Sequence, residues 1–489
     1  MSMVENPVIV VGAGPTGLTL ACGLRAAGVP VRVLDAADGP ATTSRALGLQ
    51  PRGVEVLDRL GALADLPARA LPVLNVDISV SGRMLAQLRV GQQTRLGGQP
   101  GLLMSQATIE EALRARLGQL GGIVEWGQEV TDLDQDPGGV AVRVGAEVLR
   151  AGWVAGCDGA HSRVRKAAGI DFPGVPLVER FLIADVRAPL KRPRDAAAVW
   201  FRGLDMLAAF PLPGADLWRL MTPAPADAAI SPEELLRRRL ARETGVAVRT
   251  VDWLSTFQIQ RRLATTYRRG RVLLAGDAAH IHSPLGGQGM NTGMGDAENL
   301  AWKLAAVVLG RAGEPLLDTY LAERRPLAAE VLRNTTGATN VLFSSGHLAR
   351  LLRELLVVPA MRLSLVQRRI AEGASQLTIS YRGGPLAPAG PRRGGLRPGD
   401  RVPDLTCCRA DGSTTRLHAE LGGRWALLAP TAAPVTATRD WLGDLLTELT
   451  WDRHELALVR PDGHLAWRGT DTAGLTRWLA QTLSRPGPR

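Results

Sequence analysis

Apolar runs and a helical pattern alternate between the start of the chain and Asp35. Residues 7–11 form a short, β-branched apolar run, which is typical of a strand buried on both faces. Residues 18–27 follow a helical pattern, and residues 31–34 form a second apolar run that ends at Asp35. This order predicts a strand, a helix and a second strand, which together make a βαβ unit.

A glycine-rich turn connects the first predicted strand to the helix. It reads Gly12-Ala-Gly14-Pro15-Thr16-Gly17, the spacing G-x-G-x-x-G, and Asp35 follows about twenty positions further on. Gly12 permits the turn, Gly14 lets the backbone approach a pyrophosphate, and Gly17 lets the helix lie close to the strand. The helix N-terminus favours the negative charge of that pyrophosphate, and Asp35 would accept hydrogen bonds from a ribose. The motif predicts a dinucleotide site without deciding between FAD and NAD.

Two further turns follow predicted buried strands. Residues 153–157 form an apolar strand that ends in Asp158-Gly159, and a helix is expected from about His161. A plain hairpin or loop is the alternative for this turn. A strand that begins at Arg271 delivers Gly276-Asp277 to its carboxyl end, where open α/β sheets bind ligands.

A glycine-rich loop of residues 284–293 follows Asp277 and leads into a helix expected over about 291–309. Four glycines lie within eight residues of this loop, which indicates that the backbone approaches a flat or anionic group. The helix N-terminus can stabilise negative charge on an electron-accepting ring. His280 and His282 lie beside Asp277, but no third ligand is evident, so a metal site is not expected.

The remaining patterns predict helices and strands that surround these motifs. Ser105 caps a helix over about 106–120, and Ser231 opens another with a capping box. Antiparallel strands are expected over about 181–222 and 248–260. After a helical region and a linker rich in Gly, Pro and Arg over 382–401, a small α/β unit is expected. Its predicted elements are strands at 425–429 and 455–459 and helices at 436–449 and 472–483.

Composition is typical of a cytoplasmic globular protein. Hydrophobic residues make up 45% of the chain and charged residues 21%. The net charge of +11 comes mostly from Arg spread along the chain, so no nucleic-acid partner is expected. The four cysteines show neither metal nor C-x-x-C spacing, which indicates a reducing compartment. Neither a signal peptide nor a membrane span is expected, because no basic leader and no apolar run of about 18 residues is evident.

The three motifs together resemble those of the FAD-dependent aromatic hydroxylases, the single-component class typified by p-hydroxybenzoate hydroxylase and phenol hydroxylase. The resemblance covers essentially the whole chain and is closest to the aromatic polyketide hydroxylases of antibiotic biosynthesis. Those enzymes add a thioredoxin-like domain after a Pro-Gly linker, as Arg397-Pro-Gly-Asp400 suggests here. Where redox-active thioredoxins carry C-x-x-C, this chain reads Pro430-Thr-Ala-Ala-Pro434, so the resemblance implies a structural role for this domain.

The resemblance implies an α/β fold in three parts. A Rossmann-like FAD-binding domain with long C-terminal helices is expected to carry an inserted β-rich substrate domain and a C-terminal thioredoxin-like α/β domain that lacks C-x-x-C. The expected ranges are 1–75, 101–172 and 265–385 for the FAD-binding domain, 76–100 and 173–264 for the substrate domain, 386–402 for a linker and 403–489 for the thioredoxin-like domain.

By the same resemblance, each motif has a part in binding FAD. Asp35 would hold the adenosine ribose, Arg45 the pyrophosphate region, and Gln106 would lie near the ribityl chain. Asp277 would bind ribityl or pyrophosphate oxygens, and Asp158 would support the FAD phosphates and the approach of the nicotinamide cofactor. Backbone amides of the 284–291 loop would lie near N1 and O2 of the isoalloxazine ring. The residues expected to bind cofactor are Gly12, Gly14, Pro15, Thr16, Gly17, Asp35, Arg45, Gln106, Asp158, Gly276, Asp277, Pro284, Gly287, Gly289, Met290 and Asn291. The loop expected beside the flavin ring contains Pro284, Gly286, Gly287, Gly289 and Asn291.

The implied activity is hydroxylation of a multi-ring, polyketide-type aromatic compound. NAD(P)H, with NADPH favoured, would bind transiently and reduce noncovalent FAD, and O₂ would then form the flavin C4a-hydroperoxide whose distal oxygen enters the ring. The cofactor carries this chemistry while the protein orients the ring and excludes water, so no catalytic residue is named. The chain is expected to be a monomer or homodimer.

Other functions of the same scaffold stay open. Baeyer–Villiger insertion, antibiotic inactivation, a flavin dehydrogenase or reductase, and a non-enzymatic FAD-binding module are the alternatives. Four aromatic residues and one proline on alternating strands of the middle region are candidate pocket walls, although ordinary core packing explains each of them equally well. These candidates are Trp200, Phe201, Phe210, Pro211 and Trp218.

Overall fold

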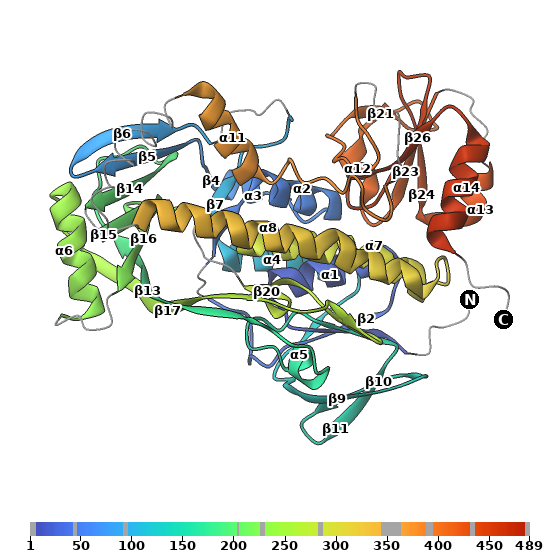
Figure 1. Ribbon diagram of the computed structural model, residues 1–489, viewed down its shortest axis with the longest axis horizontal. Coiled ribbons are helices and arrows are strands. Elements are labelled where there is room, and N and C mark those ends of the chain that lie inside the picture. The colour runs from blue at the N-terminus through green and yellow to red at the C-terminus, as the bar shows by residue number, and fades with distance from the viewer. Residues whose placement is uncertain are drawn as a thin grey trace.

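The computed structural model describes residues 6–42, 46–90, 96–202, 205–224, 230–281, 287–343, 363–387, 395–430 and 436–484, with the backbone alone at 176–179, 259, 334–343 and 436–437. The strands in these residues form five sheets, of which three are large (Figure 1). No helix among them is long and apolar enough to cross a membrane.

The first large sheet is built around β1 (Val8–Val11), whose residues are all buried. β1 pairs in parallel with β2 (Val31–Leu34) and with β12 (Trp153–Gly156). A strand covered on both faces needs apolar side chains throughout, which explains the unbroken apolar run of β1. α1 (Pro15–Ala26) joins β1 to β2, which confirms the predicted βαβ unit. The strand order is β18 (Arg268–Arg269), β19 (Val272–Leu274), β12, β1, β2 and β8 (Val124–Glu125).

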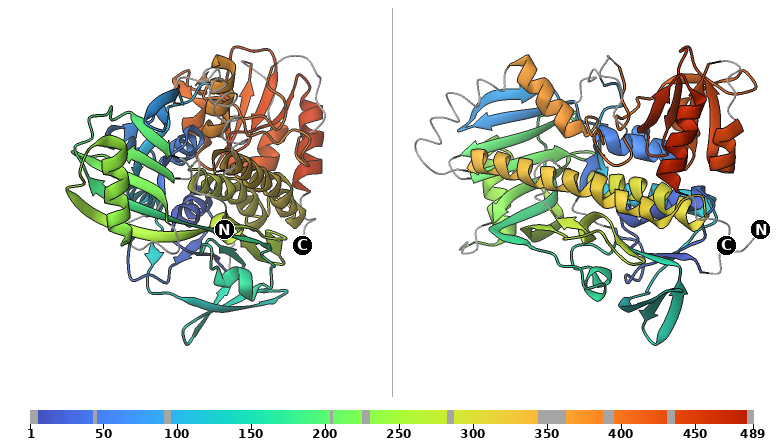
Figure 2. Two further views of the ribbon diagram at one scale, coloured as in Figure 1. Left: turned by 60° about the vertical axis from the view of Figure 1, so that its left-hand side comes forward. Right: turned by 45° about the vertical axis from the view of Figure 1, so that its right-hand side comes forward.

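Helices and a small sheet cover this first sheet (Figures 1 and 2). α1, α4 (Gln106–Gln119) and α7 (Gly289–Val308) lie on one side, and α1 packs against both of the others. The Ser105 hydroxyl accepts a hydrogen bond from the Ala107 amide at 3.2 Å, so the predicted cap of α4 is confirmed. On the other side lie α5 (Arg163–Ala167) and a three-stranded meander of β9 (Val130–Asp136), β10 (Gly139–Val144) and β11 (Glu147–Ala151).

The second large sheet has eight strands and joins the middle of the chain to residues 75–88. α6 (Pro232–Thr244) covers one face of it, and the Ser231 hydroxyl accepts from the Glu234 amide at 3.2 Å, as the capping box predicts. The strand order is β20 (His280–Ile281), β17 (Thr250–Leu263), β13 (Gly174–Arg187), β16 (Leu217–Ala224), β15 (Asp205–Pro211), β14 (Ala196–Arg202), β5 (Asn75–Val80) and β6 (Arg83–Leu88).

Shorter elements and two later helices complete this part of the molecule. The long helix α8 (Asp318–Phe343) runs alongside the first and the second large sheets, and α11 (Ser364–Ser375) follows it (Figure 1). The short elements are β3 (Leu47–Leu49), α2 (Pro51–Leu60), α3 (Leu66–Arg69), β4 (Leu71–Pro72), β7 (Leu102–Ser105), and the 3-10 turns Gly276–Ala278 and Glu314–Leu317.

The third large sheet lies near the carboxyl end of the chain, in red in Figure 1. The helix predicted over 436–449 is confirmed only in its first half, because α13 (Thr436–Leu442) ends at Leu442 and a strand, β24 (Leu446–Thr450), replaces the second half. Gly443 adopts φ +55° at this point, a conformation that ends helices. The sheet consists of β22 (Thr414–Arg416), β21 (Thr406–Cys408), β24 (Leu446–Thr450), β23 (Trp425–Ala429), β25 (Leu456–Val459) and β26 (Leu465–Gly469), with α12 (Leu417–Leu421), α13 (Thr436–Leu442) and α14 (Thr472–Leu483).

This C-terminal sheet packs directly against α7 and α8. The ring of Trp302 on α7 meets that of Trp425 on β23 edge to face, with centroids 5.1 Å apart. Beside them, Arg460 donates two hydrogen bonds to the Glu323 carboxylate on α8, at 2.7 and 2.9 Å. Asp462 accepts from the indole of Trp302 at 3.2 Å. The C-terminal sheet and the first sheet are therefore joined through a shared, buried contact region.

Candidate functional site

The turn after β1 leaves open space at only one of its glycines. A β-carbon on Gly12, which has φ +104°, would lie 2.4 Å from the Cys157 carbonyl oxygen, and one on Gly17 would lie 1.9 Å from the Gly12 oxygen. At Gly14 a β-carbon would meet no protein atom within 4 Å. Gly14 is also the N-cap of α1 and offers no side-chain cap, so the first amides of the helix are left for a ligand.

Asp35 is oriented toward this turn from the end of β2. Its Oδ2 accepts a hydrogen bond from the Ala13 amide at 2.6 Å, and its Oδ1 accepts from the Ala37 amide at 2.9 Å. Each carboxylate oxygen can accept a further hydrogen bond, because a carboxylate offers about four lone-pair sites. The half-buried side chain is therefore held in place for a hydroxyl donor.

Thr16 brings the first and third motifs together, which sequence reasoning missed. A β-carbon on Gly276, at φ +63°, would lie 2.6 Å from the Thr16 hydroxyl oxygen, and one on Gly293 would lie 2.4 Å from it. The start of α1 therefore fits against the turn after β19 and against α7. The two glycines were visible in the sequence, but their common neighbour depends on the tertiary fold.

Asp277 stands at the carboxyl end of β19 in the 3-10 turn. Its side chain is exposed and accepts no hydrogen bond from a described residue. Many protein atoms nevertheless surround it, and this desolvation together with the charge of Asp296 raises its pKa, against the opposing effect of His280. An exposed carboxylate at this position fits a ligand that carries hydroxyl groups.

His280 pairs with an acidic residue on α7 that the sequence did not single out. Its Nε2 lies 2.6 Å from Asp296 Oδ2, and both side chains are fully buried. Asp296 also accepts from Arg324 Nε at 2.7 Å and from the Gly276 amide at 3.2 Å. Burial alone would raise the pKa of Asp296, but His280 and Arg324 outweigh it and hold the pKa below its ordinary value. His280 thus fixes the Gly276 turn to α7.

Part of the predicted flavin-ring loop lies outside the described residues, including Pro284 and Gly286, and so does Arg45. Gly287 adopts φ +61°. Asn291 is buried, accepts from the Gln50 amide at 2.9 Å and donates to the Gly287 oxygen at 3.2 Å, so its side chain fixes the loop.

The start of α7 has the features expected beside an anionic ring. No side chain caps this start at Gln288, just before Gly289. Met290 is half-buried against the core of the first sheet. The amides of the first turn are therefore not capped by a side chain, as they would be in an ordinary helix.

Asp158 and Gln106 have partners within the protein. Asp158 accepts from the Ser162 hydroxyl at 2.5 Å and from the Arg163 amide at 2.7 Å, so it caps α5, which begins at Arg163 and not at about His161. Gln106 Nε2 donates to Glu110 at 2.7 Å on α4. Their roles toward FAD therefore stay predictions.

Strand alternation divides the candidate substrate residues between the two faces of the eight-stranded sheet. Trp200 and Trp218 lie in the core beneath α6, and Pro211, the register partner of Trp218, shares that face. On the opposite face Phe201 is buried, and Phe210 is half-buried and packs against the same cluster. Trp200, Trp218 and Pro211 are therefore corrected to core residues, and only the two phenylalanines stay candidates.

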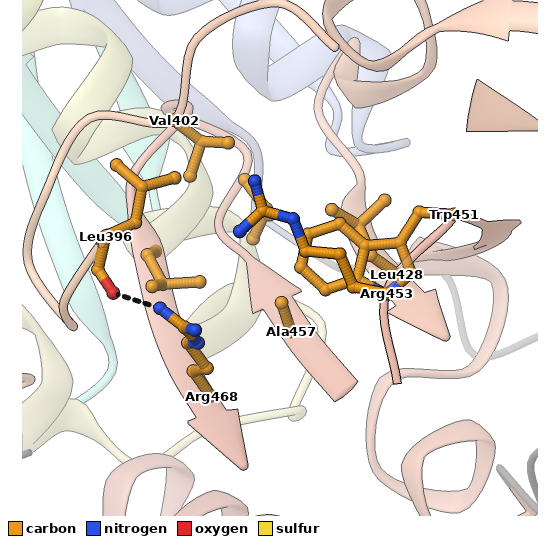
Figure 3. A pocket seen from close by; sticks show the side chains of 9 residues that line it. Leu396, Val402, Leu428, Trp451, Arg453, Ala457 and Arg468 are labelled. Carbon is orange, nitrogen blue, oxygen red and sulfur yellow. Dashed lines mark hydrogen bonds between the residues drawn. The ribbon is translucent and has the colours of Figure 1, made fainter. Parts of the chain in front are cut away.

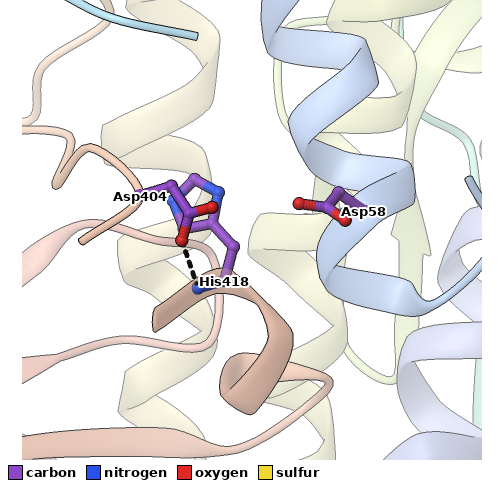
Figure 4. Close-up of side chains that lie close together, drawn as sticks. All are labelled: Asp58, Asp404 and His418. Atoms are coloured by element: carbon purple, nitrogen blue, oxygen red, sulfur yellow. Dashed lines mark hydrogen bonds between the residues drawn. The ribbon is translucent and has the colours of Figure 1, made fainter. Parts of the chain in front are cut away.

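One group of potential metal ligands comes together among the described residues. Asp58 projects from α2, and Asp404 and His418 belong to the C-terminal region (Figure 4). The guanidinium of Arg416 already bridges the two carboxylates, at 3.0 Å from Asp58 and 2.9 Å from Asp404. Burial also lowers the pKa of His418 to about 3. An arginine therefore supplies the positive charge that a metal ion would otherwise bring.

A small cavity lies inside the C-terminal sheet (Figure 3). Its volume is about 10 Å³, and apolar side chains such as Leu428, Ala457 and Val459 line it. A space of this size holds about one water molecule. This cavity is too small for a substrate. The residues suited to bind a ligand lie instead at the carboxyl edge of the first sheet.

The residues at that edge fit a bound dinucleotide. The space above Gly14, the uncapped starts of α1 and α7, and the two carboxylates Asp35 and Asp277 converge from separate parts of the chain. Amides suit a pyrophosphate, and carboxylates suit hydroxyl groups. Together these features define a dinucleotide-binding protein of the α/β class.

Comparison with protein families identifies which dinucleotide this is. A model described as "FAD binding domain" matches residues 5–335, and one described as "Aromatic-ring hydroxylase, C-terminal" matches residues 396–486. The chain therefore belongs to the FAD-dependent aromatic-ring hydroxylases and is a flavoprotein monooxygenase, which confirms the resemblance inferred from the sequence.

Individual monooxygenases and hydroxylases resemble this chain over most of its length. The chain is 39% identical over 454 residues to 6-methylpretetramide 4-monooxygenase from Streptomyces rimosus, covering 86% of this chain and 78% of that protein. The structure of anhydrotetracycline hydroxylase from Streptomyces rimosus matches 98% of this chain and 99% of its own, with 35% identity and a TM-score of 0.80. Aklavinone-11 hydroxylase, solved with FAD and aklavinone, is 25% identical with a TM-score of 0.77, over 99% and 100% of the two chains.

Proposed function

We propose that this monooxygenase uses NADPH and O₂ to hydroxylate a multi-ring aromatic compound of the polyketide type. The observation that carries the proposal is the convergence of Thr16, Gly276 and Gly293, which joins the dinucleotide turn to the start of α7. Relatives named for 6-methylpretetramide, anhydrotetracycline and aklavinone support a multi-ring substrate.

The residues of this chain would bind and orient the reactants. Gly14 and the start of α1 would hold the pyrophosphate, Asp35 the ribose hydroxyls, and Asp277 oxygens of the ribityl chain. Bound noncovalently, FAD would supply the redox chemistry by accepting a hydride and activating O₂. The uncapped amides at the start of α7 would stabilise negative charge on the reduced ring.

The substrate would lie between the first sheet and the face of the eight-stranded sheet that carries Phe201 and Phe210. Arg219, the register partner of Phe210, donates to the Ala46 oxygen at 3.0 Å and so contacts the loop after Arg45. Phe201 and Phe210 would supply an apolar wall for the rings, which would help to exclude water from the reduced cofactor.

The division of labour along the chain is part of this proposal. Residues 1–75, 101–172 and 265–385 would bind FAD, and residues 76–100 and 173–264 would bind substrate. Residues 403–489, after the linker at 386–402, would form a thioredoxin-like unit with a structural role. The enzyme would work in the cytoplasm as a monomer or homodimer.

Turnover in ¹⁸O₂ tests the reaction. The purified holoenzyme, NADPH and a panel of multi-ring phenols that includes anhydrotetracycline should yield a product that carries one ¹⁸O atom. Proton spectra of the product would distinguish a ring hydroxyl group from a Baeyer–Villiger ester. A product with oxygen from solvent alone would overturn the proposal and favour a flavin dehydrogenase.

A further inference from the structure

A groove of about 380 Å³ opens where β13 begins, β17 ends and α8 passes by. Figure 1 shows α8 lying alongside these two strands. Three arginines and three apolar side chains line the groove, which we call the arginine groove. Its lining residues are Pro173, Gly174, Arg261, Arg262, Leu263, Leu332 and Arg333.

The three arginines of the groove have no carboxylate partner among the described residues. Arg262 donates to neutral groups, the Gln260 side chain at 3.0 Å and the Phe172 oxygen at 3.3 Å. Arg261 Nε is buried and makes no hydrogen bond, and Arg333 is exposed. By contrast, Arg219 on the same sheet forms two hydrogen bonds to Asp185, at 2.7 and 2.8 Å.

Two further arginines extend this positive charge toward the cofactor site. Arg165 stacks on the Phe172 ring, 3.9 Å from its centroid, and donates to the Ala278 oxygen at 2.9 Å. Arg325 donates to the Ala264 oxygen at 3.0 Å. Among the described residues both donate to backbone carbonyl oxygens and to no carboxylate, although the charge of Asp158 acts on Arg165 from further away. Unpaired guanidinium groups of this kind favour an anionic ligand, because a guanidinium binds phosphate oxygens in a bidentate manner.

We propose that the arginine groove binds the phosphate groups of the nicotinamide dinucleotide that reduces the flavin. This inference rests on the proposed use of NADPH. Arg262 pairs in register with Ile281, the last described residue before the loop that leads to Gly287. Arg165 contacts the turn that carries Asp277. The groove therefore adjoins β20, the strand that follows the turn of Asp277.

The lining of the groove matches the two chemical parts of a nucleotide. Pro173, Leu263 and Leu332 provide apolar surface for a base, and the guanidinium groups provide charge for phosphates. The groove volume lies in the range of about 300–1,000 Å³ that is typical of small-molecule sites. A ligand held on one open side of the protein is consistent with a reductant that binds and leaves in every cycle.

Binding of adenosine 2′,5′-bisphosphate to the oxidised holoenzyme, measured by calorimetry, tests the groove without turnover. Arg261→Gln, Arg262→Gln and Arg333→Gln should each raise its dissociation constant about tenfold, as loss of one charge-assisted hydrogen bond implies. Arg249→Gln is the matched control, because Arg249 is an exposed arginine that pairs with Asp216 away from the groove. It should bind like the parent.

Anaerobic reduction of the flavin by NADPH and by NADH then identifies the phosphate. The three variants should weaken binding of the reductant while the limiting rate of reduction is retained. Weaker binding of NADPH alone would assign the groove to the 2′-phosphate, and equal weakening of both to the pyrophosphate. Unchanged affinity in all three variants would overturn the proposal that the arginine groove binds these phosphate groups. This result is independent of the ¹⁸O₂ experiment, since binding to the oxidised enzyme requires no hydroxylation.

Discussion

Gly14 differs from Gly12 and Gly17 because a β-carbon added to it would meet no protein atom, whereas one added to either neighbour would collide with the backbone. We therefore expect Gly14→Ala to leave the fold intact and to weaken FAD binding, since a methyl group would occupy the space above the helix N-terminus. Flavin affinity should be measured by fluorescence titration of the apoprotein, and stability by thermal unfolding.

Gly118→Ala is the matched control for this change. Gly118 lies in α4, and a β-carbon there also meets no atom within 4 Å. The substitution should stabilise the protein by about 0.5–1 kcal/mol, because alanine is the better helix former, and leave FAD binding unchanged. Equal FAD affinity in the two variants would show that Gly14 does not face the cofactor.

The carboxylate of Asp277 supplies a second single-residue prediction. Asp277→Asn should keep the shape of the side chain and weaken FAD binding by about 1.5–3 kcal/mol, the value of a hydrogen bond to a charged group. The dissociation constant of the flavin gives this directly, with Asp216→Asn, a surface carboxylate that pairs with Arg249, as the control. Unaltered affinity would mean that Asp277 makes no contact with the cofactor.

Individual elements were predictable where a local signal set both ends. α2, for example, begins at Pro51 and ends before Gly61, and α6 begins after Ser231, so capping residues defined their limits. β24 was missed because its five residues have little apolar pattern of their own. It is held instead by parallel pairing with β23, a contact distant in the sequence.

The motifs of the candidate site were predictable for the same reason, but their partners were not. Gly12, Gly14 and Gly17 stand in a fixed local spacing, whereas His280 pairs with Asp296 on another element. Alternation along β14 and β16 also placed Trp200 and Trp218 on the face under α6, which the sequence could not assign without the sheet order.

The strand β21 carries the two adjacent cysteines of the C-terminal region. Cys407 is buried, and this burial raises the pKa of its thiol to about 11, so it stays protonated and unreactive at neutral pH. Cys407→Ser with Cys408→Ser should therefore leave NADPH consumption unchanged. Turnover and thermal unfolding should be compared with the parent. A large loss of activity in a folded double variant would indicate a thiol role for this strand.

For the whole molecule, buried titratable groups set the dependence of stability on pH. Burial lowers the pKa of His418 to about 3 and that of His464 to about 4, so the unfolded chain binds more protons than the folded one below pH 6.5. The free energy of unfolding should therefore fall as pH drops from 6.5 toward 4, by up to about 1.4 kcal/mol per pH unit for each histidine.

Carboxylates continue this trend at lower pH. Burial favours the neutral form of Glu55 and Glu323, but neighbouring arginines, and Lys303 beside Glu323, outweigh it and lower both pKa values to about 2. The contribution of these two carboxylates to the free energy of unfolding is complete above pH 4.5 and is lost as pH falls toward 2. Denaturant unfolding across this range measures the curve, and His418→Gln should reduce its slope between pH 6.5 and 4. If the free energy of unfolding of that variant had the same slope against pH as the parent, His418 would not contribute to the pH dependence of stability.

The C-terminal sheet and the FAD-binding part should unfold together, because their contact is buried and charged. Arg460 is 2% exposed and binds Glu323, which also accepts from Lys303 at 2.8 Å. Arg460→Met would leave the remaining buried charges uncompensated and should cost about 3–5 kcal/mol. Arg468→Met removes a more exposed pair with Glu455 inside the C-terminal region and should cost less than about 1 kcal/mol. Calorimetry should show one transition in the parent and a large shift only in the first variant. Two separate transitions in the parent would show that the C-terminal sheet is an independent unit.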